Sequence, residues 1–382
     1  MANTPKVTLI YENGNLLQDI AAADGIVAIC GTGASVGLLG TPMVVYNLDD
    51  AIEKGFTLAA EPEMYRHLQE FYSEVGGNQE LHVMVVPDTM TLAQMVDNTN
   101  ASGAKKLINA AQGKVRMLGI YRKPASGYNG GSNFIDSDVS AAITNSKVFA
   151  EARLSELVPL RILVEGRVQT PAAANTLTPN TLSNGYAGVV LGGSRNDGSA
   201  SVGLVLGRAS RYGAHIKIGK VANGPLTINQ VYLGDKLLKD VANLDTLHGN
   251  GFITFMTHPQ KAGFFFGIDR MCSTDDYRLL AYGRVVDKAA VIAAAVYTEQ
   301  IESEIEVDGT GKIATHVVSD LETVIEQQIN VAMGSQISGV KVVINPDQNI
   351  INTNKLTIKI RVQPLGYSSF IDVELGLTTA IA

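Results

Sequence analysis

The clearest alternation of apolar and polar residues lies in the last third of the chain. Between Lys355 and Val362 every second residue is apolar, which is the period of a strand with one buried face. Residues 340–344 and 370–377 alternate in the same way. The stretch Gln363–Gly366 separates the last of these strands from the one before it, because proline and glycine interrupt a tight hairpin. The pattern predicts a small sheet with a detachable final strand.

A second detachable strand is predicted at the other end of the chain. The segment from Lys6 to Tyr11 reads KVTLIY, and the turn-forming sequence ENGN follows it at once. An isolated terminal strand pairs either within its own domain or with the sheet edge of a neighbour. The chain therefore carries a strand-forming arm at each end of a sheet-bearing domain.

Strands and helices alternate between the two arms. Apolar strands are expected at 26–30, 81–86, 115–121, 160–164 and 188–191, and helices at 61–75, 91–111, 137–158 and 201–211. This order argues for an α/β domain with a largely parallel sheet. We also expect a strand at 214–221, a helix at 235–247 and a hairpin formed by 251–256 and 263–268.

Two helices are predicted before the small sheet. The first begins at Asp275 and Asp276, since acidic residues suit a helix N-terminus, and ends near Ile301. The second covers Val317–Met333. Its expected apolar stripe is Leu321, Val324, Ile325, Gln328 and Ala332, and a polar ladder of Glu322, Glu326 and Asn330 lies opposite.

These elements divide the chain into four parts. Residues 1–23 form an N-terminal strand arm and linker, and 24–262 form a central α/β domain. Residues 263–364 form an α+β C-terminal domain of two helices and a sheet, and 365–382 form a C-terminal strand arm. The expected fold class is therefore α/β with an α+β C-terminal part.

Composition narrows the possible functions. The 382 residues include 30 Lys and Arg against 37 Asp and Glu, a net charge of −7, with 46% hydrophobic and 18% charged residues. This excludes wholesale disorder and argues against a nucleic-acid partner. Cys30 and Cys272 lack the spacing of a disulfide framework or a zinc site. Without a signal sequence or a long apolar run, we expect a cytosolic product with no membrane insertion and no cofactor.

A serine hydrolase is the alternative from another functional class. Gly33–Gly37 reads GASVG and fits the nucleophile motif G-x-S-x-G around Ser35. That motif needs a helix immediately after the serine, and the following Leu38–Pro42 is a poor helix start. None of the six histidines is singled out as a catalytic partner. A glycine-rich turn accounts for the motif better, and the hydrolase stays open as the alternative.

Basic and acidic residues gather before and within the first of the two late helices. The group consists of four basic residues and one aspartate: Arg270, Arg278, Arg284, Lys288 and Asp287. Three further aspartates lie close by in the sequence, Asp269, Asp275 and Asp276. They form either an interface charge network or ordinary ion pairs on a helix surface, which contribute about 0.3–0.5 kcal/mol each. The sequence does not decide between the two.

Several motifs resemble, in their order, the tail sheath proteins of contractile phage tails and related contractile injection systems. They are DR at 269–270, STDDYR at 273–278, YGRVVDKAA at 282–290, ISGV at 337–340 and NPDQN at 345–349. The segments at 24–34, 203–208 and 215–224 look like earlier parts of the same family. The resemblance is strongest over the last third, and none of the motifs is a catalytic signature.

The resemblance implies a non-enzymatic subunit of a sheath. Such subunits form homohexameric rings that stack helically around an inner tail tube and contract to drive the tube through a target envelope. The implied partners are other copies of the chain, the tube protein, baseplate proteins and tail terminator or cap proteins. Assembly is implied in the bacterial cytoplasm, as part of a phage virion tail or an injection particle.

The resemblance also assigns roles to residues. Terminal strands are exchanged between subunits, here Lys6, Val7, Thr8, Leu9, Ile10 and Tyr11, and Phe370, Ile371, Asp372, Val373, Glu374 and Leu375. The receiving strand is Lys355, Leu356, Thr357, Ile358, Lys359, Ile360, Arg361 and Val362. Outward Asp372 and Glu374 would match outward basic residues of that strand. By position, Glu322, Glu326 and Asn330 are expected to face the tube.

Overall fold

A seven-stranded sheet organises the first two thirds of the structure, a computed structural model that describes residues 25–373. Its strands are β1 (Val27–Thr32), β2 (Met43–Val45), β3 (Leu81–Val86), β4 (Met117–Tyr121), β5 (Arg161–Glu165), β6 (Ala187–Val190) and β9 (Phe252–Ile253). They lie in the order β2-β3-β1-β4-β5-β6-β9, and only β2 runs antiparallel to its neighbour. The predicted α/β domain with a largely parallel sheet is confirmed.

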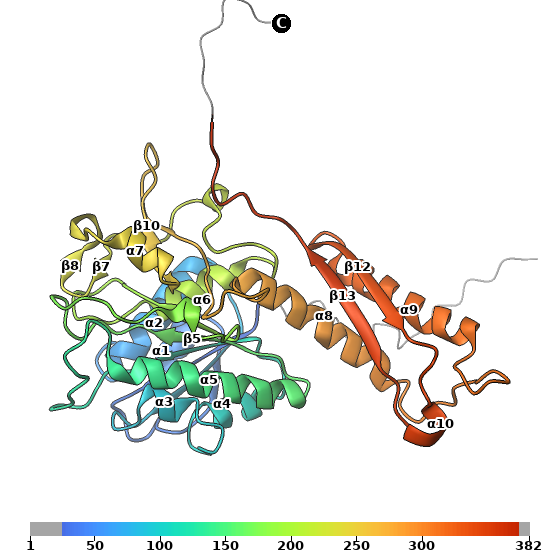
Figure 1. Cartoon of the computed structure of the whole chain (residues 1–382). Helices are drawn as coiled ribbons and strands as arrows, with labels where there is room; N and C mark the ends of the chain where they lie inside the picture. The colour runs from blue at the N-terminus through green and yellow to red at the C-terminus, as the bar shows by residue number, and fades with distance from the viewer. Residues whose placement is uncertain (1–24, 374–382) are drawn as a thin grey trace, which may run out of the picture.

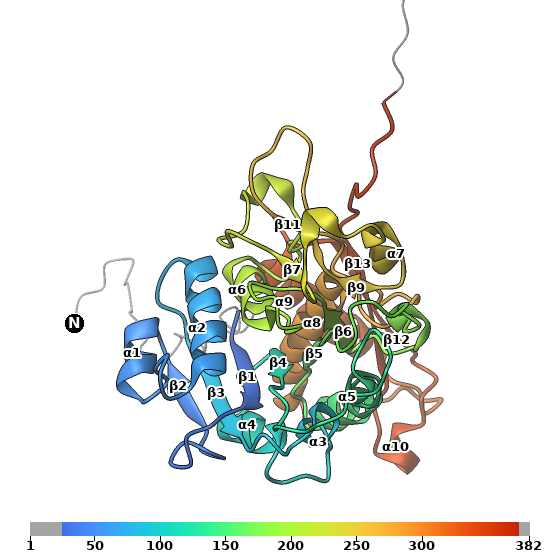
Figure 2. The same cartoon turned by 90° about the vertical axis from the view of Figure 1, so that its left-hand side faces the viewer.

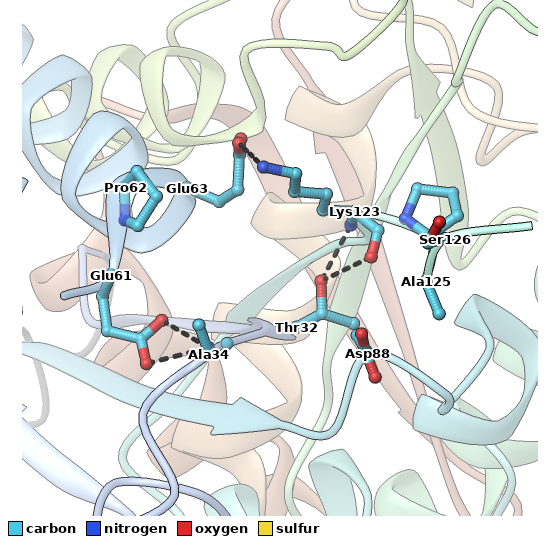
Figure 3. Close-up of a pocket in the computed structure, with 11 residues that line it drawn as sticks. Thr32, Ala34, Glu61, Pro62, Glu63, Asp88, Lys123, Ala125 and Ser126 are labelled. Atoms are coloured by element: carbon cyan, nitrogen blue, oxygen red, sulfur yellow. Dashed lines mark hydrogen bonds and ion pairs between the residues drawn. The ribbon is translucent and has the colours of Figure 1, made fainter. Parts of the chain in front are cut away.

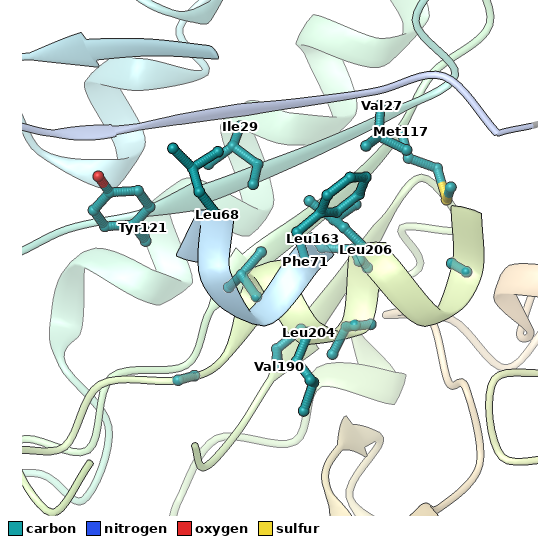
Figure 4. Packing of buried hydrophobic residues seen from close by; sticks show 14 of the residues in the cluster. Val27, Ile29, Leu68, Phe71, Met117, Tyr121, Leu163, Val190, Leu204 and Leu206 are labelled. Carbon is teal, nitrogen blue, oxygen red and sulfur yellow. The ribbon is translucent and has the colours of Figure 1, made fainter. Parts of the chain in front are cut away.

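Helices cover both faces of this sheet, which is why its central strands are continuous apolar runs. One face is covered by α1 (Leu48–Glu53), α2 (Pro62–Val75) and α6 (Val202–Arg211), the other by α3 (Leu92–Met95), α4 (Ala104–Ala110) and α5 (Ser137–Ser155) (Figure 2). Figure 4 shows Leu68 and Phe71 of α2 and Leu206 of α6 packed against the sheet. Gly203 lets α6 approach α2, because a Cβ there would clash with the His67 carbonyl.

Shorter elements follow, and two predictions for them are wrong. Residues 214–221 form turns rather than a strand, with Ile216 N–H donating to Gly213 and Lys220 N–H to Lys217. The predicted helix at 235–247 is replaced by the hairpin of β7 (Tyr232–Leu233) and β8 (Lys236–Leu237), the 3₁₀ turn η4 (Leu238–Asp240) and the short helix α7 (Leu244–Gly249). Gly234, at φ +66°, makes the hairpin turn possible.

The hairpin predicted over 251–268 forms only in part. β9 joins the large sheet, and only β10 (Phe255–Met256) pairs with β11 (Phe265–Phe266). Phe266 and Met271 pack in the same core as β1. The α/β unit therefore extends past the predicted boundary at residue 262. Two further 3₁₀ turns, η2 (Pro179–Thr181) and η3 (Val221–Asn223), lie in its loops.

The rest of the chain forms an elongated second unit beside the first (Figure 1). It comprises α8 (Leu280–Thr298), α9 (Thr315–Met333), β12 (Ile337–Ile344), α10 (Ile350–Thr353) and β13 (Ile358–Pro364). α8 runs from the large sheet into this unit, where α8, α9 and the β12–β13 hairpin enclose a separate core. Within residues 25–373, no helix has the length and apolar character needed to span a bilayer.

The start of α8 differs from the prediction. Leu280 is its first residue, and the buried Asp269 accepts hydrogen bonds there, from Leu280 N–H at its carbonyl (2.8 Å) and from Ala281 N–H at its carboxylate (3.1 Å). Burial raises the pKa of Asp269. Asp275, which we expected to cap the helix, accepts instead from Tyr277 N–H (2.8 Å) within a preceding turn. The cap thus comes from a residue eleven positions before the helix.

The buried face of α9 also differs from the expected stripe. Ile325, Ile329 and Met333 are its buried residues, whereas Val324 is 46% exposed and Gln328 is exposed. Ile325, Ile329 and Met333 recur every four residues, so they form one line along the helix. The polar ladder lies beside this line rather than opposite to it, as its contacts with β12 show below.

Candidate functional site

The β12–β13 hairpin is the centre of the candidate assembly site. Its antiparallel register places Val342 opposite Ile360 and Ile344 opposite Ile358. The strand expected over 355–362 forms as β13, with its alternation of apolar inward and polar outward residues, although its pairing begins at Ile358 rather than Lys355. The outward face of the hairpin is basic, with the exposed Lys341, Lys359 and Arg361.

The apolar face of the hairpin is covered unevenly. On β12, Val342 and Ile344 are buried, at 0% and 3% exposure. On β13, Ile358, Ile360 and Val362 are only half-buried, although they belong to the same core. The side chains of β13 therefore keep apolar surface that nothing in the described part of the chain covers.

A groove borders the beginning of β13. It has a volume of about 760 Å³ and lies between the end of α8, the start of α9, α10 and β13. Its lining is largely apolar and includes Tyr297, Ile301, Leu321, Leu356 and Ile358. Burial raises the pKa of the Tyr297 hydroxyl to about 12. The groove thus extends the incompletely covered apolar surface of β13.

The outer edge of β12 is occupied by two carboxylates from α9. Glu322 Oε1 accepts the Ile344 N–H (2.7 Å), and Glu326 Oε1 accepts the Val342 N–H (2.8 Å). Lys341 Nζ donates to the same Glu326 oxygen (2.9 Å). The pKa of Glu326 is lowered mainly by the hydrogen bond from the Val342 amide and next by the hydrogen bond from Lys341. Of the three residues expected to face the tube, Asn330 is exposed, whereas Glu322 and Glu326 are half-buried.

The chain beyond β13 is anchored to the α/β unit. The Tyr367 hydroxyl donates to the carbonyl of His215 (2.5 Å), and its ring lies 5.5 Å from that of Tyr282. Lys217 Nζ lies over the Tyr367 ring and donates to Ser369 Oγ (3.1 Å). These contacts fix the root of the C-terminal arm at one place on the α/β unit.

Past this anchor the arm forms no strand within residues 25–373. Phe370, Ile371 and Val373 are 82%, 74% and 71% exposed, and the segment leads away from β13 (Figure 1). Its apolar side chains are therefore not buried by the subunit's described residues. The other predicted exchange residues, Lys6–Tyr11, Glu374 and Leu375, lie outside the described residues.

The five residues of the predicted charge network are divided between the interior and the surface. Asp287 accepts two hydrogen bonds from the buried Arg161 of β5, at 2.6 Å each. Arg284 is buried and donates to the Tyr212 carbonyl (3.1 Å), and Lys288 is also buried. Arg270 is half-buried, and Arg278 is exposed beside the Tyr282 ring. Most of this charge therefore lies inside the subunit, where it joins α8 to the α/β unit.

Arg161 is a structural residue that the sequence analysis missed. It lies 126 positions before Asp287, at the start of a strand that otherwise reads as apolar. The only sequence signal for this pair was the group of charged residues around Asp287. That signal does not indicate that the partner of Asp287 is Arg161.

A small cavity of about 260 Å³ lies at the carboxyl ends of β1, β3 and β4 (Figure 3). Strand order reverses at β1, and this is where many α/β proteins bind ligands. Here the amides of Ala34 and Ser35 donate to the carboxylate of Glu61, at 3.0 and 2.6 Å. The chain's own side chain thus fills the position that an anionic ligand would take.

The nucleophile elbow expected of a hydrolase is not formed at Ser35. A turn at residues 36–38, not a helix, follows the serine. The Ser35 hydroxyl donates to the Ala60 carbonyl (3.2 Å), and no histidine within residues 25–373 hydrogen-bonds to it. In the same part of the chain, no three His, Cys, Asp or Glu side chains gather as a metal site.

The fold is that of the sheath proteins of contractile injection systems. The sheath protein in the contracted complex of PVC, an extracellular contractile injection system, superposes with a TM-score of 0.65 over 99% of both chains at 12% identity. The contracted helical sheath of the anti-feeding prophage (AFP) gives 0.62 at 12% identity, covering 98% of this chain and 99% of the other. A sheath tail protein from Desulfitobacterium hafniense gives 0.51 at 10% identity, covering 94% and 100%.

These likenesses confirm the sheath resemblance at the level of the fold. The chain belongs to the DUF2586 family: residues 4–270 match the N-terminal domain of that family, and residues 276–382 match its C-terminal domain. The two matches meet in the loop before α8. A comparison with curated proteins finds no match.

Proposed function

We propose that the protein is a structural subunit of a contractile tail sheath. It polymerises as stacked hexameric rings around an inner tube and contracts by rigid-body rearrangement. The fold shared with sheath proteins over nearly the whole chain supports this function. The observation that carries it is the exposed apolar segment at Phe370–Val373. This segment occurs in the same chain as β13, a strand whose apolar side chains are incompletely covered.

Strand exchange accounts for both features together. In solution, Phe370, Ile371 and Val373 would expose apolar surface at a cost of about 25 cal/mol per Å². Adding the segment to the sheet of a second copy buries this surface and pairs its backbone groups, as in β-augmentation. In the same proposal, residues 6–11 of the N-terminal arm add to a neighbour in the same way.

Contraction then requires movement at the arms rather than within the units. Backbone pairing keeps the subunits linked while the N-terminal linker and the chain immediately beyond the anchored Tyr367 and Ser369 act as hinges. Stored energy would lie in an extended state that is less stable than the contracted one, so contraction would need no bound nucleotide.

The outward face of α9 is the proposed contact with the inner tube. Val331 is 86% exposed, and Val324 and Asn330 are also exposed on this helix. Baseplate proteins and terminator or cap proteins are the further proposed partners at the ends of the sheath. The particle would be a phage tail or an injection system assembled in the bacterial cytoplasm.

Negative-stain electron microscopy of the purified protein, alone and with its tube protein, tests the proposal. We expect hollow cylinders with regular transverse striations, because stacked rings repeat along the axis. Uniform small particles at every concentration, including those with the tube protein present, would contradict a sheath.

A further inference from the structure

The two outer edges of the β12–β13 hairpin are not equivalent. On β12, the outward amides of Val342 and Ile344 donate to Glu326 and Glu322 of α9. Four residues along a helix advance about 6 Å, and two residues along a strand advance about 6.8 Å. Two carboxylates four positions apart on α9 therefore meet two residues two positions apart on β12.

On β13, the outward amides have no such partners among residues 25–373. Directly opposed residues of an antiparallel pair share the same orientation, so the amides of Ile358, Ile360 and Val362 point outward like those of Val342 and Ile344. Within residues 25–373, no side chain and no backbone carbonyl accepts from these three amides. The nearest capped position is Thr357, whose N–H donates to Gln348 Oε1 (2.6 Å).

We propose that Glu322 and Glu326 close the β12 edge of the free subunit, so that an incoming strand from a second copy adds to β13. Exposed strand edges pair indiscriminately unless side chains or helices cover them. The two carboxylates occupy the outward amides of Val342 and Ile344, and among residues 25–373 they leave that of Val340 without an acceptor. The β13 edge stays open beside its half-buried apolar side chains. This inference rests on the strand exchange of the proposed function.

Charge complementarity selects the C-terminal arm as the strand that adds to β13. The outward residues next to this edge are the basic Lys359 and Arg361. The C-terminal segment carries Asp372 and Glu374 at alternate positions, whereas KVTLIY at 6–11 carries no acidic residue. Opposite charges on neighbouring strands contribute about 0.2–1 kcal/mol per pair.

Disulfide trapping between two differently tagged copies tests which edge is used. One copy carries Phe370→Cys, and the other carries Lys359→Cys or Arg361→Cys on β13, or the directly opposed Val343→Cys or Lys341→Cys on β12. The native Cys30 and Cys272 are buried and do not compete. Because adjacent strands lie about 4.8 Å apart and the next strand about twice as far, we expect on the order of tenfold more cross-linked dimer with β13.

The second part of this experiment removes the carboxylates that close the β12 edge. With Glu322→Ala and Glu326→Ala in the receiving copy, trapping at Val343→Cys should rise to within about twofold of trapping on β13, since both edges then offer free amides. Glu322→Gln with Glu326→Gln keeps an acceptor oxygen and should keep the β13 preference. A matched control, exposed Asp320→Ala on α9, should leave the preference unchanged.

Amide exchange in the full-length chain tests the closed edge without any assembly. With selective ¹⁵N labelling of valine and isoleucine, the amides of Val342 and Ile344 should exchange at least about tenfold more slowly than those of Ile358 and Ile360. Among the described residues, acceptors are present for the former pair alone. The double alanine variant should remove this difference.

The outcomes separate this inference from the proposed function. Equal trapping on both strands, or equal exchange of the two sets of amides, overturns the closed edge even where cylinders are seen by microscopy. Slow exchange at Val342 and Ile344 in a chain that forms neither cylinders nor cross-linked dimers supports the closed edge but overturns the proposed sheath and the strand addition.

Discussion

Arg161 and Asp287 hold the two units of the subunit together. The guanidinium reaches Asp287 through two hydrogen bonds of 2.6 Å, and it also donates to the carbonyls of Gly185 and Gly283. Both side chains are buried. A buried pair of this kind contributes little net stability compared with apolar residues of the same size, but either charge alone is costly.

Replacing Asp287 with alanine should therefore destabilise the subunit by about 3–5 kcal/mol, because Arg161 would be left buried without its counter-charge. Urea unfolding monitored by circular dichroism measures this loss. Exposed Asp276→Ala is the matched control and should change stability by less than about 0.5 kcal/mol. A loss as small for Asp287→Ala as for the control would show that the pair does not join the units.

Ser35 is expected to be dispensable for any chemistry. Its hydroxyl is bound to the Ala60 carbonyl, and its backbone amide is bound to Glu61. Ser35→Ala should leave particle assembly unchanged, as measured by electron microscopy. It should also leave the rate of p-nitrophenyl ester hydrolysis unchanged. Turnover in the native chain that Ser35→Ala abolishes would favour the hydrolase instead.

At the scale of elements, hydrogen bonds join α9 to the outer edge of β12, from the strand's amides to the carboxylates of the helix. Glu322 and Glu326 were recognisable in the sequence as a polar line along a helix, but their role depends on which surface that line meets. The structure places it against a strand edge, while Ile325, Ile329 and Met333 enter the core. Helix α9 therefore both packs against the hairpin and closes one of its edges.

This ladder should weaken only in acid. Hydrogen bonds from Val342 and Lys341 lower the pKa of Glu326 in the folded chain, and Glu322 is the other ionisable group beside it. A lowered carboxyl pKa means that the ionised form is favoured by folding. Its stabilising contribution is present above the ordinary glutamate pKa and is lost as the pH falls through the lowered one.

The Val342 amide resonance of ¹⁵N-valine-labelled protein reports on this titration. We expect it to shift with a midpoint below the ordinary glutamate pKa, and Glu326→Gln should abolish the shift. A midpoint at or above the ordinary value would show that the carboxylate does not bind this amide in solution.

At the scale of the whole molecule, the subunit has an anchored but unpaired C-terminal arm. Tyr367 and Ser369 hold its root through His215 and Lys217, and Phe370–Val373 extend beyond them into solvent. Within residues 25–373, the segment past the anchor makes no hydrogen bond with the rest of the fold. Its apolar side chains are thus available to another copy.

Deleting residues 370–382 should leave a folded subunit that does not form long cylinders. The anchor at Tyr367 is kept, so thermal unfolding should shift by no more than about 2–4 °C, while strand exchange is lost. Deleting residues 1–15 should impair assembly in the same way. Cylinders of full length from either variant, seen by electron microscopy, would contradict the exchanged arms.

Local pattern was enough to predict much of this architecture. The strand Leu81–Val86 and the helix ending at Val75 were predicted with these boundaries, and the inward and outward residues of β13 were assigned correctly. Predictions failed where turn chemistry competed with periodicity, as at Gly234, or where a cap came from elsewhere in the chain, as with Asp269.

Apolar periodicity along the chain was sufficient to show the alternating α/β order and the small C-terminal sheet, because it records which face of each element is buried. It contains no information about what covers that face. The pairing of Arg161 with Asp287, the Asp269 cap and the closing of β12 by Glu322 and Glu326 join residues far apart in sequence. Only the packing of the elements brings such groups within hydrogen-bonding distance.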